Sequence, residues 1–123
     1  MGENIKVATA QFENRSGDKE YNLGVIESIT KSAASQGAKL IAFHECSITG
    51  YTFARHLTRE EMVDLAEPIP EGPSIAVLQQ IAAENDIAVF AGLFEKDAEN
   101  NLYKAYVGVD AHGLLAKYRK IHP

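Results

Sequence analysis

The amino-acid sequence predicts an α/β fold in which helices cover a mixed β-sheet. Two runs, residues 39–43 and 87–94, are apolar at consecutive positions, which is typical of strands in a sheet covered by helices. Two amphipathic segments, residues 19–36 and 74–85, precede these runs and predict crossover helices. Turn residues at 97–101 separate two later apolar segments and indicate a hairpin. Crossovers together with hairpins predict a sheet with both parallel and antiparallel strands.

The first part of the chain is expected to form a strand, a helix and a second strand. Residues 5–12 alternate imperfectly and predict a short strand, and residues 14–18 are rich in turn formers. The helix at 19–36 carries apolar residues at helical spacing: Leu23, Ile26, Ile29 and Ala33. Gly37 follows, where a left-handed helix cap is expected. The second strand is residues 39–43.

A loop and two helices are expected to follow. Residues 46–55 form the loop, and residues 58–61 have the pattern of a capping box that opens a short helix ending near Ala66. Three prolines within 68–73 end that helix. The second amphipathic helix then covers residues 74–85, with Pro73 near its first turn.

Three strands are expected to complete the chain. They cover residues 87–94, 102–110 and 114–118, with a tight connection at 110–113 between the last two. No internal repeat or linker is visible, so the 123 residues are expected to form one unit.

The composition excludes several classes of function. A hydrophobic content of 46% with 24% charged residues is ordinary for a soluble globular protein. The net charge of -5 disfavours binding to nucleic acid or to an anionic membrane. No apolar run approaches the roughly 20 residues of a membrane span, and the N-terminus lacks the apolar core of a secretory signal. The one cysteine, Cys46, excludes an internal disulfide, so a cytoplasmic location is expected.

Glu45 is the first candidate for chemistry. It follows a predicted buried strand, and ligands of open α/β sheets bind near the carboxyl ends of the strands. Loss of water there would make the carboxylate a stronger proton acceptor, which suits a general base. The alternative is a surface glutamate just past a strand end.

Lys120 is the second candidate. Strand alternation places Arg119 on one face, with Tyr118 and Lys120 on the other. An inward lysine beside a carboxylate would stabilise an oxyanion. The alternative is a solvated basic strand end that includes Lys117.

Cys46 and Glu95 are weaker candidates for a catalytic role. Cys46 adjoins Glu45, but neighbours in a strand point to opposite faces, so a small buried residue is the favoured interpretation. Glu95 follows a buried strand and is either part of the same site as Glu45 or a structural carboxylate at the strand end. The four histidines form no pair with the spacing of a helical metal site.

The chain resembles the N-terminal part of the nitrilase superfamily, the carbon–nitrogen hydrolases. The resemblance lies in the order and spacing of short segments rather than in any single one. The segments are residues 7–11, 37–45, 50–51, 91–95, 102–103 and 117–122.

The resemblance implies an αββα sandwich and a Glu-Lys-Cys mechanism that uses no metal or cofactor. Glu45 matches the general base, Lys120 matches the lysine that stabilises the tetrahedral intermediate, and Glu95 matches a supporting glutamate. The expected substrates are amides, N-carbamoyl amines or nitriles. Tyr51 and Phe53 are candidate pocket walls.

Three departures from the family pattern qualify these expectations. His44 stands where the family usually has proline, and Lys104 where it commonly has asparagine. The family's nucleophilic cysteine belongs to a strand beyond Lys120, and Cys46 does not match it.

The resemblance also predicts how the chain relates to a whole enzyme. Residues 1–123 are expected to be the N-terminal portion of one hydrolase domain whose C-terminal half is missing. Such a portion would be inactive alone, would expose apolar surface and strand edges, and would self-associate or pair with the missing half.

Two alternatives remain open at this stage. One is a catalytically inactive α/β module that binds a small molecule or a partner chain. The other is a flavodoxin-like or response-regulator domain, which fits the size of the chain but lacks a phosphate loop or an acidic pocket at the strand ends.

Overall fold

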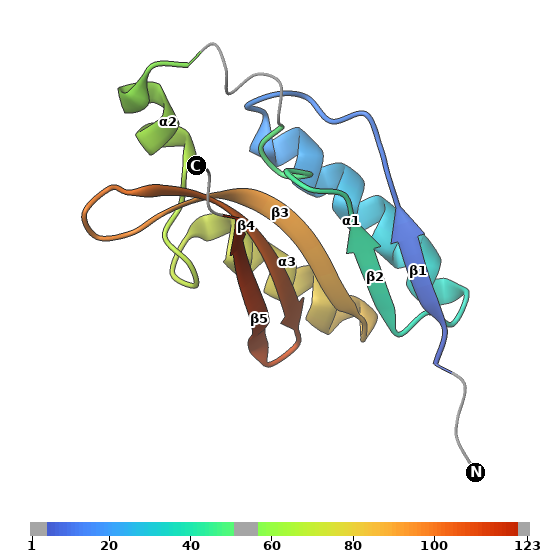
Figure 1. Cartoon of the computed structure of the whole chain (residues 1–123). Helices are drawn as coiled ribbons and strands as arrows, with labels where there is room; N and C mark the ends of the chain where they lie inside the picture. The colour runs from blue at the N-terminus through green and yellow to red at the C-terminus, as the bar shows by residue number, and fades with distance from the viewer. Residues whose placement is uncertain (1–4, 51–56, 121–123) are drawn as a thin grey trace.

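A computed structural model describes residues 5–50 and 57–120 (Figure 1). The described chain contains five strands and three helices. In chain order these are β1 (Val7–Ala10), α1 (Lys19–Ser35), β2 (Leu40–Phe43), α2 (Arg59–Leu65), α3 (Pro73–Asn85), β3 (Ala88–Lys96), β4 (Leu102–Asp110) and β5 (Gly113–Lys120).

The five strands form one mixed sheet in the order β1-β2-β3-β4-β5. β1, β2 and β3 are parallel and are joined through the helices, whereas β3, β4 and β5 are antiparallel and are joined by hairpins. The predicted α/β class with a mixed sheet is therefore confirmed. The long β3–β4 ladder runs from Val89 opposite Val109 to Lys96 opposite Leu102.

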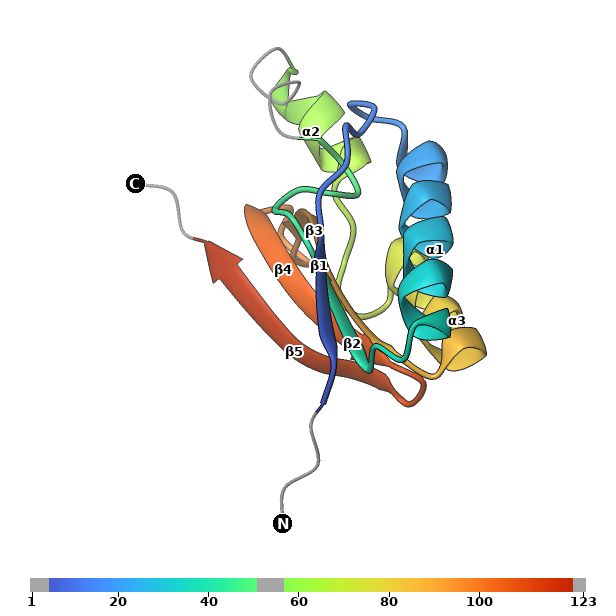
Figure 2. The ribbon, with the colours of Figure 1, turned by 90° about the vertical axis from the view of Figure 1, so that its right-hand side faces the viewer.

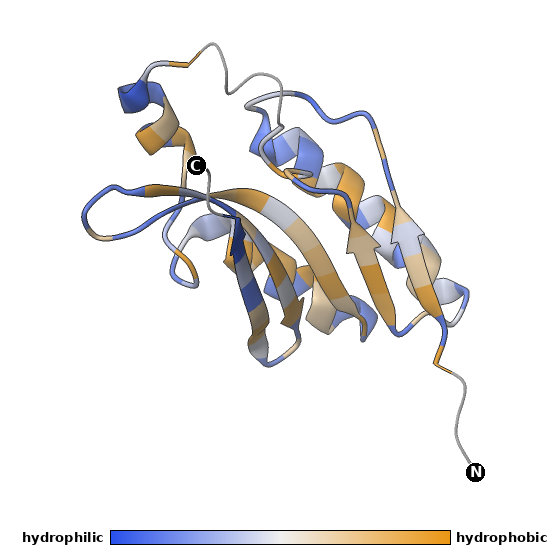
Figure 3. Cartoon of the chain, viewed as in Figure 1, coloured by the Kyte–Doolittle hydropathy of each residue, from blue (hydrophilic) through white to orange (hydrophobic). Residues whose placement is uncertain are grey.

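Helices α1 and α3 lie side by side on one face of the sheet (Figure 2). Their apolar residues, among them Ile26, Leu78 and Ile81, pack against alternate residues of β2, β3 and β4 to form the main core. On β3 those residues include Val89, Ala91 and Leu93, all fully buried. The strands are hydrophobic along β2 and most of β3, while the second half of β5 is hydrophilic (Figure 3).

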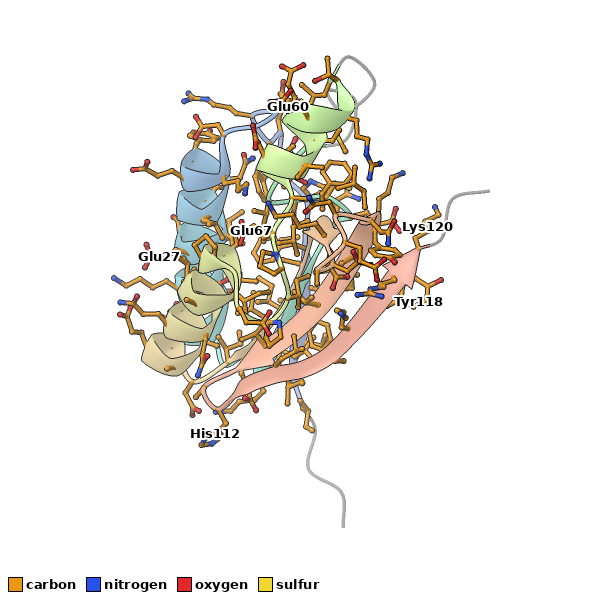
Figure 4. The ribbon with its side chains drawn as sticks, turned by 90° about the vertical axis from the view of Figure 1, so that its left-hand side faces the viewer. Glu27, Glu60, Glu67, His112, Tyr118 and Lys120 are labelled. Carbon is orange, nitrogen blue, oxygen red and sulfur yellow. The ribbon has the colours of Figure 1, made fainter. Side chains whose placement is uncertain are left out.

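The other face of the sheet is not covered by α1 or α3. Leu40, Ala42 and Phe90, which alternate with core residues, are only half-buried. Val7 is 57% exposed and Tyr118 is 67% exposed. Figure 4 places Tyr118 and Lys120 on the side of β5 that faces away from these helices. We call this side of the sheet the open face, although α2 lies at its edge near the end of β3.

Local signals in the sequence account for the ends of the helices. The Asp18 side chain accepts a hydrogen bond from the backbone N–H of Tyr21 and so caps α1. Gly37 has the expected left-handed backbone after α1, at φ 92°. Thr58 and Glu61 form the predicted capping box of α2.

Two predicted strand ends were too early. β3 continues to Lys96, so Glu95 lies within a strand rather than after one, and β5 continues to Lys120. Pairing explains both extensions, because Glu95 is opposite Tyr103 in the β3–β4 ladder and Lys120 is opposite Lys104 in the β4–β5 ladder. The candidate pocket walls Tyr51 and Phe53 lie outside the described residues.

Candidate active site

Glu45 lies in a turn directly after β2. The turn is held against β3 at Gly92, whose N–H donates to the Ser47 hydroxyl at 3.1 Å and whose carbonyl accepts from the N–H of Ile48 at 2.9 Å. A Cβ atom at Gly92 would clash with the backbone nitrogen of Cys46. Glycine is therefore required at this position for the turn to approach β3 closely.

The burial expected for Glu45 was wrong for the described chain. Its side chain is exposed, because it projects from the turn beyond the end of β2 and not from the strand itself. The carboxylate thus meets solvent here and not an apolar pocket.

Lys120 ends β5 on the open face, as strand alternation predicted (Figure 4). It lies opposite Lys104 of β4, and residues directly opposite in an antiparallel pair project to the same face. The charges of Lys120 and Glu45 both influence the Cys46 thiol, in opposite directions.

Cys46 itself is enclosed. It is 2% exposed and packs with Ala66 and Phe94 under residues of α2. Burial raises the pKa of the Cys46 thiol; Lys104 acts in the opposite direction and Glu45 reinforces the rise. A thiol that is buried and protonated is a poor nucleophile. The interpretation of Cys46 as a small buried residue is therefore confirmed.

Tyr106 was not singled out by sequence reasoning. Its hydroxyl donates a 2.6 Å hydrogen bond to the carbonyl of Phe43, the last residue of β2. Burial raises the pKa of Tyr106, and the Glu45 charge adds to this rise. The tyrosine therefore ties β4 to the point where the Glu45 turn begins. The signal available in the sequence was strand alternation, which places Tyr106 on the same face of the predicted strand 102–110 as Lys104.

Glu95 is 1% exposed and lies on the face of the sheet opposite to that of Lys120. It accepts hydrogen bonds from Lys117 Nζ at 2.6 Å and from Arg119 Nε and Nη2 at 2.7 and 2.9 Å. Burial raises the pKa of Glu95, but the bonds from Arg119 and Lys117 outweigh it and the net pKa is lowered. Glu95 is thus ionised and binds Lys117 and Arg119 of β5. It does not form a common site with Glu45.

Further contacts around Arg119 support its ion pair with Glu95. The Arg119 guanidinium lies 4.1 Å from the centre of the Tyr103 ring. The Tyr103 hydroxyl donates to Asp97 at 3.1 Å. Asp97 also accepts from the backbone N–H groups of Glu99 and Asn101, which closes the β3–β4 turn.

Glu67 is a buried carboxylate that sequence reasoning missed. It accepts hydrogen bonds from the N–H and hydroxyl of Ser74 and from Lys19 Nζ at 2.9 Å. It therefore caps α3, whose own N-cap residue Gly72 makes no side-chain bond. Figure 4 shows Glu67 between α1 and the start of α3. Nothing in the local sequence pattern predicts a cap from five residues upstream of the helix N-cap.

Other polar and titratable groups among the described residues bear on the site. Nδ1 of His44 is buried without a hydrogen-bond partner among them, and burial lowers the pKa of His44. The residues that the structure describes contain no group of three or more acidic, histidine or cysteine side chains able to hold a metal ion. None of their helices is long and apolar enough to cross a membrane.

Comparison with known proteins identifies the family. The family model described as carbon-nitrogen hydrolase matches residues 6–123. The chain belongs to the carbon–nitrogen hydrolase family. It is 37% identical over 118 residues to a nitrilase of Pyrococcus abyssi, covering 96% of this chain and 44% of that protein. It is 32% identical over 119 residues to an N-carbamoylputrescine amidase of Solanum lycopersicum, covering 96% and 38%.

Solved structures support the same fold. An N-terminal amidase crystal structure matches with a TM-score of 0.79 at 24% identity, covering 97% of this chain and 28% of that one. An amidase from Nesterenkonia sp. matches with a TM-score of 0.75 at 24% identity, covering 96% and 43%. The chain thus spans less than half the length of these carbon–nitrogen hydrolases and amidases.

Proposed function

We propose that the protein carrying this chain hydrolyses non-peptide carbon–nitrogen bonds in amides, N-carbamoyl amines or nitriles. Family membership supports the reaction type, and the similar proteins named nitrilase and N-carbamoylputrescine amidase span the substrate classes. The observation that supports the proposal is that Glu45 lies in the turn bound to β3 at Gly92, that Lys120 ends β5 on the open face, and that both charges influence the Cys46 thiol. An acid and a cation suit proton transfer and oxyanion stabilisation.

For an amide substrate, the proposed reaction proceeds through a covalent intermediate. Glu45 takes the proton of a cysteine thiol, and the thiolate attacks the carbonyl carbon of the substrate. Lys120 stabilises the oxyanion that forms. Glu45 then gives its proton to the leaving nitrogen as the C–N bond breaks. Water attacks the resulting thioester and passes a proton to Glu45, and that proton returns to the sulfur as the acid product leaves.

We propose that the attacking thiolate comes from outside these 123 residues. Cys46 is the one cysteine of the chain, and it is buried. In a mutant of the amidase from Nesterenkonia sp. AN1, acrylamide is added at the active site cysteine. A cysteine brought to the open face would meet Glu45 and Lys120 from the side that α1 and α3 leave uncovered.

Glu95 is proposed to position β5 and not to transfer protons. Its three hydrogen bonds reach Lys117 and Arg119, and the second of these is the residue next to Lys120. These bonds hold the end of β5 against β3 and β4, and so determine where Lys120 projects. We also propose a cytoplasmic protein that assembles through its open face, with another segment or with a second copy.

A substrate panel tests the proposed reaction. The protein carrying this chain is incubated with an aliphatic amide, an N-carbamoyl amine and a nitrile, and release of ammonia or amine is measured. We expect turnover of at least one class above a blank that contains the protein treated with a thiol-blocking reagent. Turnover of none would reject the hydrolase. The buried state of Cys46 then favours the alternative, an inactive module that binds a small molecule or a partner chain.

A further inference from the structure

The turn that carries Glu45 contains an unfavourable backbone conformation. Cys46, the next residue, has a φ of 53°, in the left-handed region that residues other than glycine rarely adopt. Such a conformation persists only where surrounding contacts fix it, and conformations of this kind cluster at functional sites. The direction of the Glu45 side chain therefore depends on the contacts that hold the backbone on each side of it.

Tyr106 holds the backbone before Glu45. It belongs to β4, yet its hydroxyl donates at 2.6 Å to the carbonyl of Phe43, the last residue of β2. Strand β3 lies between β2 and β4, so the tyrosine side chain must cross it. The residue directly opposite Tyr106 on β3 is Gly92, which has no side chain to block that path. The glycine that admits the Glu45 turn thus also admits the tyrosine that binds the end of β2.

Asn14 holds the backbone after Glu45. It lies in the loop between β1 and α1, and its side-chain amide donates to the carbonyls of Cys46 at 2.9 Å and Ser47 at 3.3 Å. A primary amide has two N–H donors, so one asparagine serves both carbonyls. Both Asn14 and Tyr106 are half-buried. Side chains from two different parts of the fold therefore hold the chain two residues before Glu45 and one residue after it.

We propose that Tyr106 and Asn14 are positioning residues for Glu45. Their hydrogen bonds reach backbone carbonyls and not the carboxylate, so both residues act by fixing the point from which the Glu45 side chain projects. The inference rests on the proposed function, in which Glu45 transfers protons. A general base must meet its proton within hydrogen-bond reach, and a misplacement of about 1 Å lowers the rate of an enzyme by up to about 100-fold.

Steady-state kinetics of Tyr106→Phe and Asn14→Ala test this role in the protein carrying this chain, on the best substrate of the panel. We expect each variant to lower kcat roughly tenfold and to leave KM within about twofold, because proton transfer is impaired while substrate binding is not. Tyr118→Phe is the matched control and should change neither constant, since Tyr118 lies opposite Tyr106 on β5 and is 67% exposed. An unchanged kcat, a loss confined to KM, or an equal loss in Tyr118→Phe would overturn the proposal.

A double-mutant cycle separates the positioning of Glu45 from a general weakening of the fold. If Tyr106 and Asn14 act through the Glu45 carboxylate, removal of either contact in Glu45→Gln should lower the residual kcat by less than about twofold. A further tenfold loss, about as large as in the unmodified background, would show that they act independently of Glu45 and would overturn the proposal. Melting curves confirm that each variant is folded at the assay temperature, and either residue alone suffices for the cycle.

Hydrogen exchange distinguishes this inference from the proposed reaction, because it needs no turnover. The backbone amides of Ile48 and Gly50 donate hydrogen bonds that close the turn. Mass spectrometry of a peptide covering residues 44–50 should show exchange at least about fivefold faster in both variants than in the Tyr118→Phe control, with exchange in α3 unchanged. In a protein that hydrolyses no compound of the panel, that result would support the placement of Glu45 while the hydrolase is rejected. Unchanged exchange in the turn would overturn the inference.

Discussion

Arg119 binds Glu95 through two parallel hydrogen bonds, at 2.7 and 2.9 Å, across the face of the sheet opposite to Lys120. The next residue along β5 is Lys120 itself. The Arg119–Glu95 contact therefore anchors β5 one residue away from Lys120, a proposed catalytic side chain. Bidentate pairing of this kind holds geometry as well as supplying energy.

Removal of the Glu95 charge should destabilise the fold. Breaking a buried ion pair costs about 3–5 kcal/mol; we expect a smaller loss for Glu95→Gln, about 2 kcal/mol, because the Lys117 and Arg119 side chains are 25% and 37% exposed. Urea unfolding of the protein carrying this chain measures the loss. Glu99→Gln, an exposed carboxylate in the adjacent turn, is the matched control and should change stability little. Equal effects of the two variants would contradict the assigned role of Glu95.

The stability of the fold should also decrease over a defined range of acidic pH. Hydrogen bonds from Asn101 lower the pKa of Asp97 from 3.8 to about 2, and the pKa of Glu95 is lowered from 4.5. A carboxylate with a lowered pKa in the folded state stabilises the fold fully above its unfolded pKa and loses this effect as pH falls through its folded pKa. Melting temperature should therefore decline as pH falls below about 4.5 towards 2.

Variants of Glu95 and Asp97 measure how much each carboxylate contributes to the loss of stability in acid. Glu95→Gln and Asp97→Asn should each melt lower than the unmodified protein near neutral pH and should each lose less on acidification. Glu99→Gln should follow the unmodified curve. A decline in acid as steep in both variants as in the unmodified protein would show that other groups are responsible.

Gly92 should be intolerant of any side chain. A methyl group there would meet the backbone nitrogen of Cys46 and the carbonyl carbon of Glu45, so Gly92→Ala is expected to cost roughly 2–3 kcal/mol and to displace the turn that carries Glu45. Gly24→Ala is the control, because nothing lies within 4 Å of a Cβ at that helical position. That change should stabilise α1 by about 0.5–1 kcal/mol. Denaturation midpoints measure both, and similar values for the two variants would refute the close approach.

Cys46 should resist alkylation in the folded protein. Its thiol is buried and its pKa is raised by burial, and alkylation requires an accessible thiolate. After iodoacetamide treatment near neutral pH, mass spectrometry of the Cys46 peptide should find it unmodified, and the same treatment in denaturant should modify it. Labelling at the same rate in both states would contradict the packing of this residue under α2.

Much of the fold could be predicted from the chain because local patterns and packing agree. The capping box at Thr58 and the left-handed Gly37 are local signals, and both were found as expected. The apolar spacing of Ile26 and Leu78 places these residues in the core under the sheet. The ends of β3 and β5 could not be predicted, because they depend on pairing between strands and not on the hydrophobic pattern.

The site was predictable only in outline. Strand alternation alone separates Arg119 from Lys120, and the structure agrees. The exposure of Glu45, the bond from Tyr106 to Phe43 and the cap that Glu67 places on α3 all depend on contacts between residues distant in the sequence. No spacing rule encodes such contacts.

The joint action of Glu45 and Lys120 is the core of the proposed hydrolysis of a carbon–nitrogen bond. Its most direct test is kcat/KM of Glu45→Gln and Lys120→Ala on the best substrate of the panel, with Glu99→Gln and Lys39→Ala as controls and circular dichroism as a check of folding. We expect each site variant to lose at least about 100-fold and each control to stay within about twofold. A folded Glu45→Gln or Lys120→Ala protein with unchanged kcat/KM would rule out the proposed catalytic role of that residue.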